Sequence, residues 1–424
     1  ATWCSQVTGC NGPVSSANSL IGSHYRDQIS GSGGVFPLAN GNYIVASKYW
    51  DNGSVIDTGA VTWGDGSVGT TGIVSPANSL VGSTQSDQVG SALSYGSVVT
   101  LTNGNYLIGS SAWDNGSLVD AGAVTWGNGM GGTTGAISAA NSLVGTSAND
   151  QVGDDFTGHI VELANGNYVI VTKNWDLDAT YQDVRAITWG SGTSGVAGPI
   201  STANSLVGSS HGIVGDWDET CGLIPLTNGN YLVRSELYDL DATHTDTGAV
   251  TFGSGTSGVS GFISPANSLL GSSGSDRVGE EVIALTNGNY VVNSPHWKMD
   301  GETVGAVTWG DGSVGITGPV STANSLVGND GGPIADGGVI ALANGNYAVS
   351  SPLWSTEPVW EPTNVGAVTW GNGAVGTTGV VSAANSIVGV ETYDSLSNGG
   401  MVALTNGNFI FITSYWFYTF DHAG

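Results

Sequence analysis

The sequence has very little positive charge. Its 424 residues include only seven Lys and Arg against 34 Asp and Glu, which gives a formal net charge of −27. Proteins that bind nucleic acids or anionic membranes draw much of their affinity from Lys and Arg side chains. We therefore expect no nucleic-acid partner and no attraction to anionic membrane surfaces.

Long apolar runs are also absent. No stretch of the sequence approaches the roughly 18 consecutive apolar residues typical of a transmembrane helix. The first residues, Ala1 to Cys4, do not combine a basic segment with an apolar one. We expect neither membrane insertion nor an intact signal peptide.

Cysteine is scarce, with three residues in the whole chain, too few for a disulfide framework. Cys4 and Cys10 are close enough in the sequence to form a small ring that leaves Cys221 unpaired, but three unpaired thiols fit the sequence equally well. A Cys4–Cys10 bridge would indicate an oxidising compartment, in agreement with the low Lys content.

Catalytic motifs are missing as well. The six histidines have no metal-ligand spacing, and the sequence contains no nucleophile elbow, phosphate loop or zinc motif. A non-catalytic protein is favoured. The alternative is a glycoside hydrolase or polysaccharide lyase with a carboxylate pair. Its carboxylates would come from Asp216, Asp218, Glu219, Glu236 and Glu361.

Glycine is abundant, at 69 residues against 12 prolines, which indicates many tight turns. The phrase Leu-Thr-Asn-Gly-Asn-Tyr-Leu-Ile at 101–108 recurs with small changes along the whole chain. The other copies have their Asn-Gly-Asn-Tyr, or Asn-Gly-Asn-Phe, at 40–43, 165–168, 228–231, 287–290, 344–347 and 406–409. Asn-Gly between two apolar runs predicts a hairpin with a type I′ turn, in which both central residues have positive φ.

Two further landmarks recur with the same period. An aromatic residue follows Thr in the third predicted strand, at Trp3, Trp63, Trp126, Trp189, Phe252, Trp309 and Trp370. Asn-Ser-Leu or Asn-Ser-Ile opens the fourth, at Asn18, Asn78, Asn141, Asn204, Asn267, Asn324 and Asn385. We expect the aromatic rings and the hairpin Tyr to pack between sheets, and the Asn to satisfy backbone groups of a turn.

Four antiparallel strands in roughly 60 residues are typical of a propeller blade. The sequence predicts an all-β chain in which residues 1–424 form a single seven-bladed β-propeller. The blades are expected at 33–83, 96–146, 158–209, 221–272, 281–329 and 337–390, with 398–424 plus 1–23 as the seventh. A parallel β-helix fits less well, because its rungs are usually much shorter.

The ends of the chain predict how the ring closes. The sequence begins in a third strand at Ala1-Thr2-Trp3 and reaches its last second strand at 409–413. We expect strands one and two at the C-terminus to pair with strands three and four at the N-terminus, which would leave no open sheet edge.

A propeller presents two sides. On the hairpin side, loops join strand one to two and strand three to four, and these loops hardly vary. On the loop side, loops join strand two to three and one blade to the next, and these vary. Variation within a repeat indicates where recognition is located.

The loops between strands two and three combine aromatic residues with carboxylates or amides. We consider as ligand-binding candidates Trp50, Asp51, Trp113, Asp114, Trp175, Tyr238, Trp297 and Trp354. An aromatic ring stacks on sugars while a carboxylate accepts bonds from hydroxyls, but a solvated turn after a strand has the same composition. Both interpretations stay open.

Other carboxylates on this side offer possible metal ligands. Asp-X-Asp at Asp176 and Asp178, and again at Asp239 and Asp241, can supply oxygen ligands to calcium, although the full EF-hand spacing is absent. Aspartates also recur in the links between blades, where we expect them to cap turns. These are Asp27, Asp87, Asp150 and Asp276.

The phrases Leu-Thr-Asn-Gly-Asn-Tyr, Gly-Ala-Val-Thr-Trp-Gly and Ala-Asn-Ser-Leu-Val-Gly resemble repeats of very large bacterial exoproteins of the haemagglutinin-like or adhesin-like kind. The resemblance covers essentially the whole chain. It implies a secreted or surface-exposed propeller with an adhesive or matrix role, and it carries no catalytic motif. We therefore expect an extracellular binding module that recognises glycans or cell-surface or matrix proteins. A self-associating subunit of a surface layer, matrix or filament is a further alternative.

Overall fold

The computed structural model describes residues 1–31, 34–91, 98–154, 160–210, 212–216, 222–329, 331–356 and 363–414. These residues form β-strands, turns and loops without a helix, so the predicted all-β class is confirmed. No helix able to cross a membrane occurs among them. The chain divides into two compact units, Ala1–Ser209 with Gly255–Phe262, and Ser210–Ser254 with Ile263–Gly424.

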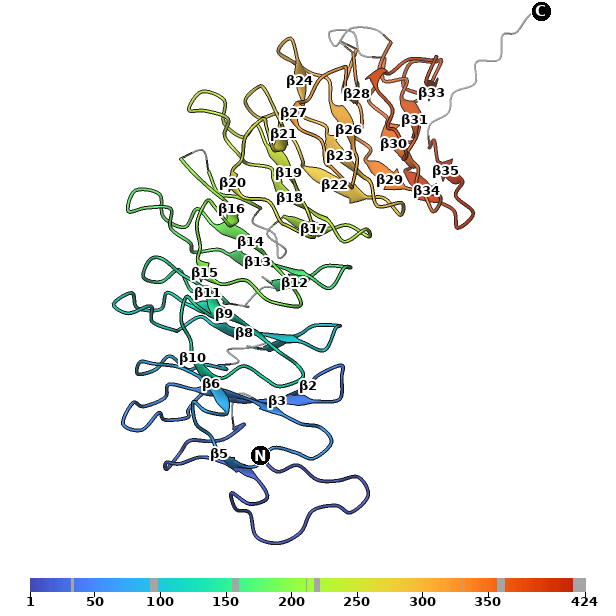
Figure 1. The fold of residues 1–424 in the computed structure, drawn as a ribbon. Coiled ribbons are helices and arrows are strands. Elements are labelled where there is room, and N and C mark those ends of the chain that lie inside the picture. The colour runs from blue at the N-terminus through green and yellow to red at the C-terminus, as the bar shows by residue number, and fades with distance from the viewer. Residues whose placement is uncertain are drawn as a thin grey trace, which may run out of the picture. The chain divides into compact units, whose positions relative to one another are not determined.

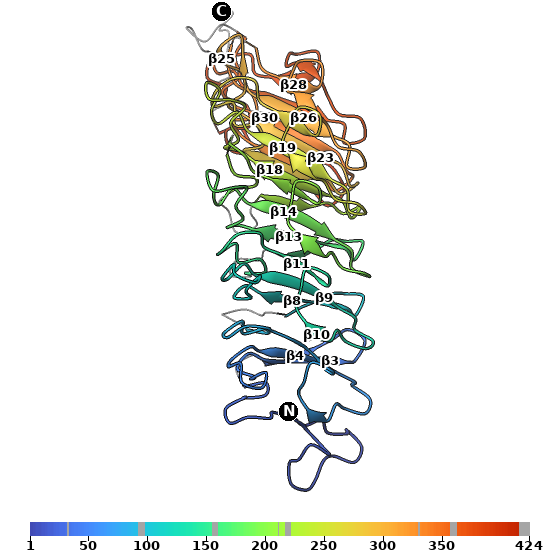
Figure 2. The ribbon, with the colours of Figure 1, turned by 60° about the vertical axis from the view of Figure 1, so that its left-hand side comes forward.

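The first unit contains three complete blades. The first blade consists of β2 (Gly34–Pro37), β3 (Tyr43–Ser47), β4 (Ala60–Gly64) and β6 (Ser79–Val81). The second consists of β7 (Val98–Thr100), β8 (Tyr106–Ser110), β9 (Ala123–Gly127) and β11 (Ser142–Val144). The third consists of β12 (Ile160–Glu162), β13 (Tyr168–Thr172), β14 (Ala186–Gly190) and β16 (Ser205–Val207). Their sheets lie in successive layers (Figures 1 and 2).

The second unit repeats the pattern. The fourth blade consists of β17 (Leu223–Pro225), β18 (Tyr231–Ser235), β19 (Ala249–Gly253) and β21 (Ser268–Leu270). The fifth consists of β22 (Glu281–Ala284), β23 (Tyr290–Ser294), β26 (Ala306–Gly310) and β28 (Ser325–Val327). The sixth consists of β29 (Val339–Ala341), β30 (Tyr347–Ser351), β31 (Ala367–Gly371) and β33 (Ser386–Val388). Each blade is a run of antiparallel strands in chain order, as predicted.

A short fifth strand, which the sequence did not predict, joins five of the blades. It comes from the strand three-to-four connection of the following blade and pairs in parallel with strand four, as in Gly135 opposite Leu80. These strands are β10 (Gly135–Ala136), β15 (Gly198–Pro199), β20 (Gly261–Phe262), β27 (Gly318–Pro319) and β32 (Gly379–Val380). Similarly, β1 (Leu20–Ile21) pairs with β5 (Gly72–Ile73). Consecutive blades within a unit are therefore hydrogen-bonded through their backbones.

Two small sheets complete the described strands: β24 (Lys298–Met299) with β25 (Glu302–Thr303), and β34 (Met401–Ala403) with β35 (Phe409–Phe411). The seven repeats are consistent with a seven-bladed propeller, but no closed sheet occurs among the described residues. Residues 415–424, the last part of the predicted seventh blade, lie outside them. Closure of the ring therefore stays a prediction.

The hydrophobic core lies between sheets. One cluster in the first unit joins Ile44 and Leu80 of the first blade to Tyr106 and Ile108 of the second. The hairpin Tyr is almost fully buried in five blades, as at Tyr106, which is 1% exposed. Burying a large side chain contributes a few kcal/mol, so packing between neighbouring sheets stabilises the blades within each unit.

The predicted type I′ turn is wrong. Gly104 has positive φ, at 87°, but Asn103 is not among the residues with positive φ. Gly104 N donates to Leu101 O, and Leu101 N donates to Asn105 O. The hairpin is thus a three-residue loop, with a type I turn followed by a left-handed glycine. The sequence cue misled because the Asn side chain has a second role, in which its Oδ1 accepts Asn105 N at 2.9 Å and its amide reaches the next blade.

On the hairpin side, three side chains converge on one carbonyl of the following blade. Gly129 O accepts hydrogen bonds from Asn40 Nδ2 at 2.8 Å, Asn42 Nδ2 at 2.8 Å and Trp63 Nε1 at 2.9 Å. The carbonyls of Gly192, Gly255 and Gly373 have the same three kinds of donor. The repeated Asn-Gly-Asn and Trp therefore form one inter-blade connection.

Candidate functional site

Before the first, second, third and fifth blades, the loop side is built on a buried aspartate in the link. Asp150, 1% exposed, accepts Thr146 N at 2.7 Å and Ser147 N at 2.8 Å through Oδ2. Its Oδ1 accepts Asp176 N, at the start of the next strand two-to-three loop, at 3.2 Å. Asp27, Asp87 and Asp276 make the corresponding three contacts. These carboxylates cap the link turn, as expected, and also hold the loop that follows.

A second aspartate holds the far end of that loop. Asp114 Oδ1 accepts Asp120 N at 2.9 Å, and Asp176 Oδ1 accepts Asp183 N at 2.8 Å. Asp120 and Asp183 have positive φ, at 51° and 52°, so the bond stabilises a backbone conformation that is otherwise unfavourable. The first and fourth blades repeat the contact with Asp51 and Asp239.

The link aspartates and the aspartates at the two ends of each loop together form what we call the loop-side framework. Their carboxylates lie close together and are partly shielded from water. Burial raises the pKa of Asp150 and of Asp276 above the usual value, although both accept backbone N–H groups. Burial, followed by repulsion from Asp114 and Asp87, raises the pKa of Asp120. The loop side therefore concentrates negative charge at positions that are fixed by the backbone.

The six aromatic candidates are not ligand platforms in this structure. They are buried: Trp50 is 2% exposed, Trp113 4%, Trp175 3%, Tyr238 7%, Trp297 4% and Trp354 3%. The five Trp rings pack in the same clusters as the strands, and the buried Tyr238 donates its hydroxyl hydrogen to Ile263 O at 3.3 Å. A sugar cannot stack on a covered ring, so we correct the stacking role of these residues to packing. Asp51 and Asp114, the candidates beside them, hold the loops as described above.

The proposed calcium ligands also act within their own loops. Asp178 Oδ1 caps the loop tip by accepting Thr180 N and Tyr181 N. Asp241 Oδ1 accepts Thr243 N and His244 N, and the Thr243 hydroxyl bond followed by the His244 bond lowers the pKa of Asp241. Among the described residues, neither pair belongs to a group of three converging metal-ligating side chains. The geometry gives Asp176, Asp178, Asp239 and Asp241 a structural role.

The carboxylates of the hydrolase alternative are only partly described. Asp216 forms an ion pair with Arg234 at 2.5 Å, and its Oδ1 accepts Glu236 N at 2.8 Å. Asp216 is not a link aspartate of this kind, because the sequence of the fourth blade has Gly212 where the third has Asp150. Asp218, Glu219 and Glu361 lie outside the described residues.

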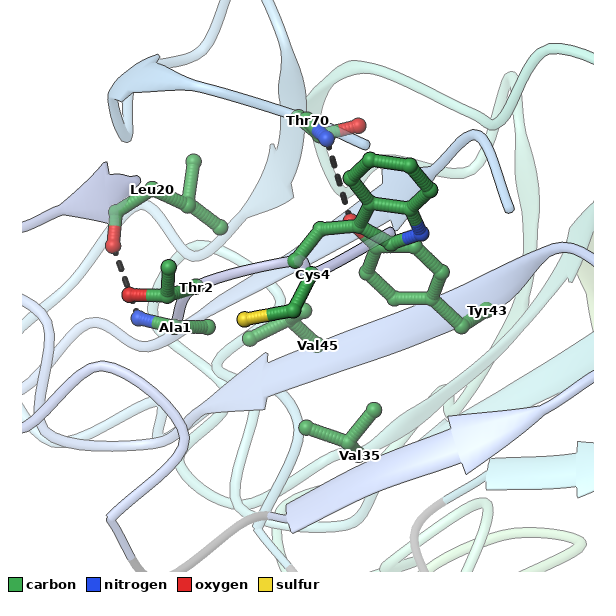
Figure 3. Close-up of a pocket in the computed structure, with 9 residues that line it drawn as sticks. Ala1, Thr2, Cys4, Leu20, Val35, Tyr43, Val45 and Thr70 are labelled. Carbon is green, nitrogen blue, oxygen red and sulfur yellow. Dashed lines mark hydrogen bonds between the residues drawn. The ribbon is translucent and has the colours of Figure 1, made fainter. Parts of the chain in front are cut away.

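A pocket of about 240 Å³ lies between residues 1–4 and the first blade (Figure 3). Val35, Tyr43 and Val45 line it from the blade, where Tyr43 Oη accepts Thr70 N at 3.0 Å. In the second blade the equivalents of the two valines, Val98 and Ile108, pack against the second strand of the blade before. The pocket is the position that the predicted ring closure assigns to a second strand.

Cys4, which also lines that pocket, forms a disulfide bond with Cys10. The bond lies in the connection between strands three and four of the predicted seventh blade, and therefore on the hairpin side. Cys221 lies outside the described residues.

The loop side is exposed at the tips of the strand two-to-three loops and at the turns of the links, where Tyr25 is 85% exposed. In the third blade Asp178, Thr180, Tyr181 and Gln182 are exposed, with Tyr181 38% exposed. The sequence analysis did not predict Tyr181, because its candidates came from the repeated Trp-Asp, which lies in the buried part of the loop. Its signal was available: Tyr181 is an aromatic residue at a tip position where the fourth blade has His244.

Comparison with known proteins identifies the repeat. A family model described as a repeat of unknown function (DUF5650) matches residues 1–31, 37–91, 100–154, 162–214, 225–280, 284–332 and 341–398. The match spans most of the chain and follows the predicted repeat. No curated protein matches it.

Proposed function

The chain belongs to this family of repeats of unknown function, and we propose that it is an extracellular, non-catalytic binding module, adhesin-like or lectin-like. The tips of the loop side recognise glycans or surface partners. One observation supports this most: in the second and third blades, loops of different length and chemistry are held by the same two aspartate contacts. Such an arrangement lets recognition change while the sheets stay the same.

The loop pairs illustrate this combination. Asp114 and Asp120 enclose residues 115–119, Asn-Gly-Ser-Leu-Val, whereas Asp176 and Asp183 enclose residues 177–182, Leu-Asp-Ala-Thr-Tyr-Gln. The fifth blade has instead the small hairpin of β24 and β25. Hydroxyl, amide and carboxylate groups at these tips suit the hydroxyl groups of a sugar. The net charge of −27 favours a neutral or cationic partner over a polyanion.

Tyr181 replaces the buried aromatics as the stacking candidate. It is exposed at the tip of the third blade, and exposed polar residues, Thr180 and Gln182, flank it. A half-exposed aromatic ring beside hydrogen-bonding groups offers both parts of a sugar contact. Weak recognition repeated over several blades would gain strength through multivalency.

A glycan array tests the proposal. The full chain is screened with calcium and again with a chelator, and Tyr181→Ala is screened in parallel. We expect binding to a group of neutral glycans that weakens by about tenfold or more in the variant. Binding to no glycan and no surface protein under either condition would contradict the proposal. Turnover of a glycan instead of binding would favour the hydrolase.

A further inference from the structure

A mixed group of metal-ligating side chains lies at the entrance to the first blade. His24, Asp27 and Asp51 each offer a ligand atom, and these atoms all lie within 4.8 Å of one another. It is the one such group of three among the described residues. His24 is exposed, Asp51 half-buried and Asp27 3% exposed, so the group opens to solvent on one side and rests on the framework on the other.

After their hydrogen bonds to the backbone, Asp51 and Asp27 still have carboxylate lone pairs that can bind a metal ion. Asp51 Oδ1 accepts Asp57 N at 2.8 Å, while its Oδ2 has no hydrogen-bond partner among the described residues. Asp27 accepts three backbone N–H groups, fewer than the roughly four lone-pair sites of a carboxylate. His24 Nδ1 lies 3.0 Å from Ser23 Oγ, which restrains the imidazole ring. Both carboxylates are thus fixed in place and retain acceptor capacity.

The second blade shows that the position of His24 reaches both carboxylates. Its equivalent is Thr84, whose Oγ1 lies 2.5 Å from Asp87 Oδ1 and 3.0 Å from Asp114 Oδ2. There the single hydroxyl hydrogen lies between two negatively charged groups. In the first blade an imidazole replaces the hydroxyl, so a nitrogen ligand stands at the point where two carboxylates meet.

The fifth blade shows a different solution at the same place. Lys298 replaces the second aspartate, and its ammonium group donates to Gly274 O in the link and acts on Asp276 as a favourable charge. The second and fifth blades thus place a hydroxyl donor or a cation next to the buried link aspartate. In the first blade the side chains supply two carboxylates and a histidine, a set suited to an added cation.

We propose that His24, Asp27 and Asp51 bind a divalent transition-metal ion of the zinc class. One imidazole nitrogen and two carboxylate oxygens suit Zn²⁺ or Co²⁺, with water completing the coordination, whereas calcium and magnesium prefer oxygen ligands alone. The ion connects the link to the strand two-to-three loop and neutralises the two aspartates. The site is independent of glycan recognition by the loop tips.

The test titrates Co²⁺ into untagged, chelator-treated protein, with the visible absorption of bound Co²⁺ and competition by Zn²⁺ as readouts. His24→Thr gives the first blade the residue of the second. Thr84→His does the reverse and adds an imidazole beside Asp87 and Asp114 in the second blade, so the two variants are matched. We expect one bound ion in the wild type, two in Thr84→His, and an affinity more than about 100-fold weaker in His24→Thr.

Two results would overturn the proposal. One is a wild type that takes up no Co²⁺ or Zn²⁺ at millimolar concentration. The other is His24→Thr binding as tightly as the wild type, which would place the ion elsewhere, for example at Cys221. Circular dichroism and the unfolding temperature of the metal-free proteins check that both variants are folded, so that a loss of binding reports on the ligand and not on the fold.

Discussion

The hairpin side and the loop side use the same type of bond for different purposes. On the hairpin side, side-chain amides and an indole bind a carbonyl of the next blade, as at Gly129. On the loop side, carboxylates bind backbone N–H groups of the link and of the following loop, as at Asp150. The hairpin contacts include the turns themselves, which therefore cannot vary. The loop contacts hold the ends of each loop, where in the second blade Asn115 and Val119 also bond to the link. The residues between these ends are free to change.

The largest effect should come from a side chain added to the hairpin side. Gly129→Ala would place Cβ 1.7 Å from Gly104 O, a backbone atom that cannot move alone. We expect the free energy of unfolding to fall by about 3 kcal/mol or more, measured by chemical denaturation. Gly131→Ala is the matched control, because nothing lies within 4 Å of its Cβ. Equal stability of the two variants would show that the close contact is not part of the fold.

The next largest loss of stability should come from removing a link aspartate on the loop side. Asp150→Ala removes the acceptor of three N–H groups around a buried position. Buried donors without a partner cost about 1–3 kcal/mol, and we expect a loss of about 2 kcal/mol in the free energy of unfolding. Asp178→Ala, at an exposed tip, should lose less than about 0.5 kcal/mol. A smaller loss for Asp150→Ala than for Asp178→Ala would reverse the assignment of framework and tip.

Removing the indole N–H donor on the hairpin side should cause a smaller loss of stability. Trp126→Phe removes one of the three donors to Gly192 O, and we expect a loss of about 1 kcal/mol. The chain contains the reverse case, because Phe252 leaves Gly312 O with the two Asn donors. Phe252→Trp should therefore stabilise the protein by about 0.5–1 kcal/mol. Thermal unfolding gives the stability of both variants relative to the wild type. A change of the same sign in both would contradict the role of the indole N–H.

The smallest effect on stability should come from Tyr181→Ala. The side chain is 38% exposed at a tip, and we expect the free energy of unfolding to change by less than about 0.5 kcal/mol. Glycan binding should weaken at the same time. A loss of stability that accounts for the loss of binding would place Tyr181 in the framework and leave the tips without a recognised ligand contact.

Much of the fold could be predicted because the sequence repeats. Six copies of Asn-Gly-Asn-Tyr and one of Asn-Gly-Asn-Phe indicated the strand order. The Asn of Asn-Ser-Leu caps its turn as expected: Asn78 Oδ1 accepts Ser75 N at 2.9 Å. The turn type could not be predicted in the same way. Asn-Gly favours positive φ at both residues when only local energy matters, but the Asn103 side chain bonds to Gly192 O of the next blade.

The candidate site was harder to predict for a related reason. Trp113 beside Asp114 has the composition of a sugar contact, and only burial shows that the ring is covered. The link aspartates were correctly predicted to cap turns, but their bond to the next loop joins residues more than 20 positions apart, as in Asp27 and Asp51. Such contacts have no signal in a local pattern. His24 is a single substitution at one link position, where the second blade has Thr84. One changed residue does not indicate a metal site until the structure shows which carboxylates lie beside it.

The division between a fixed framework and variable loop tips is tested most directly by the stability of a variant in which one loop is exchanged for another. Residues 115–119 of the second blade are replaced by residues 177–182 of the third, and Asp114 and Asp120 are kept as the anchoring pair. The exchange keeps the contact between Asp114 and Asp120 but removes the bond from Asn115 Nδ2 to Gly145 O, so we expect the free energy of unfolding to fall by about 1 kcal/mol or less. A loss of more than about 2 kcal/mol would mean that the tips are part of the framework, and the loop side could not then vary independently of the sheets.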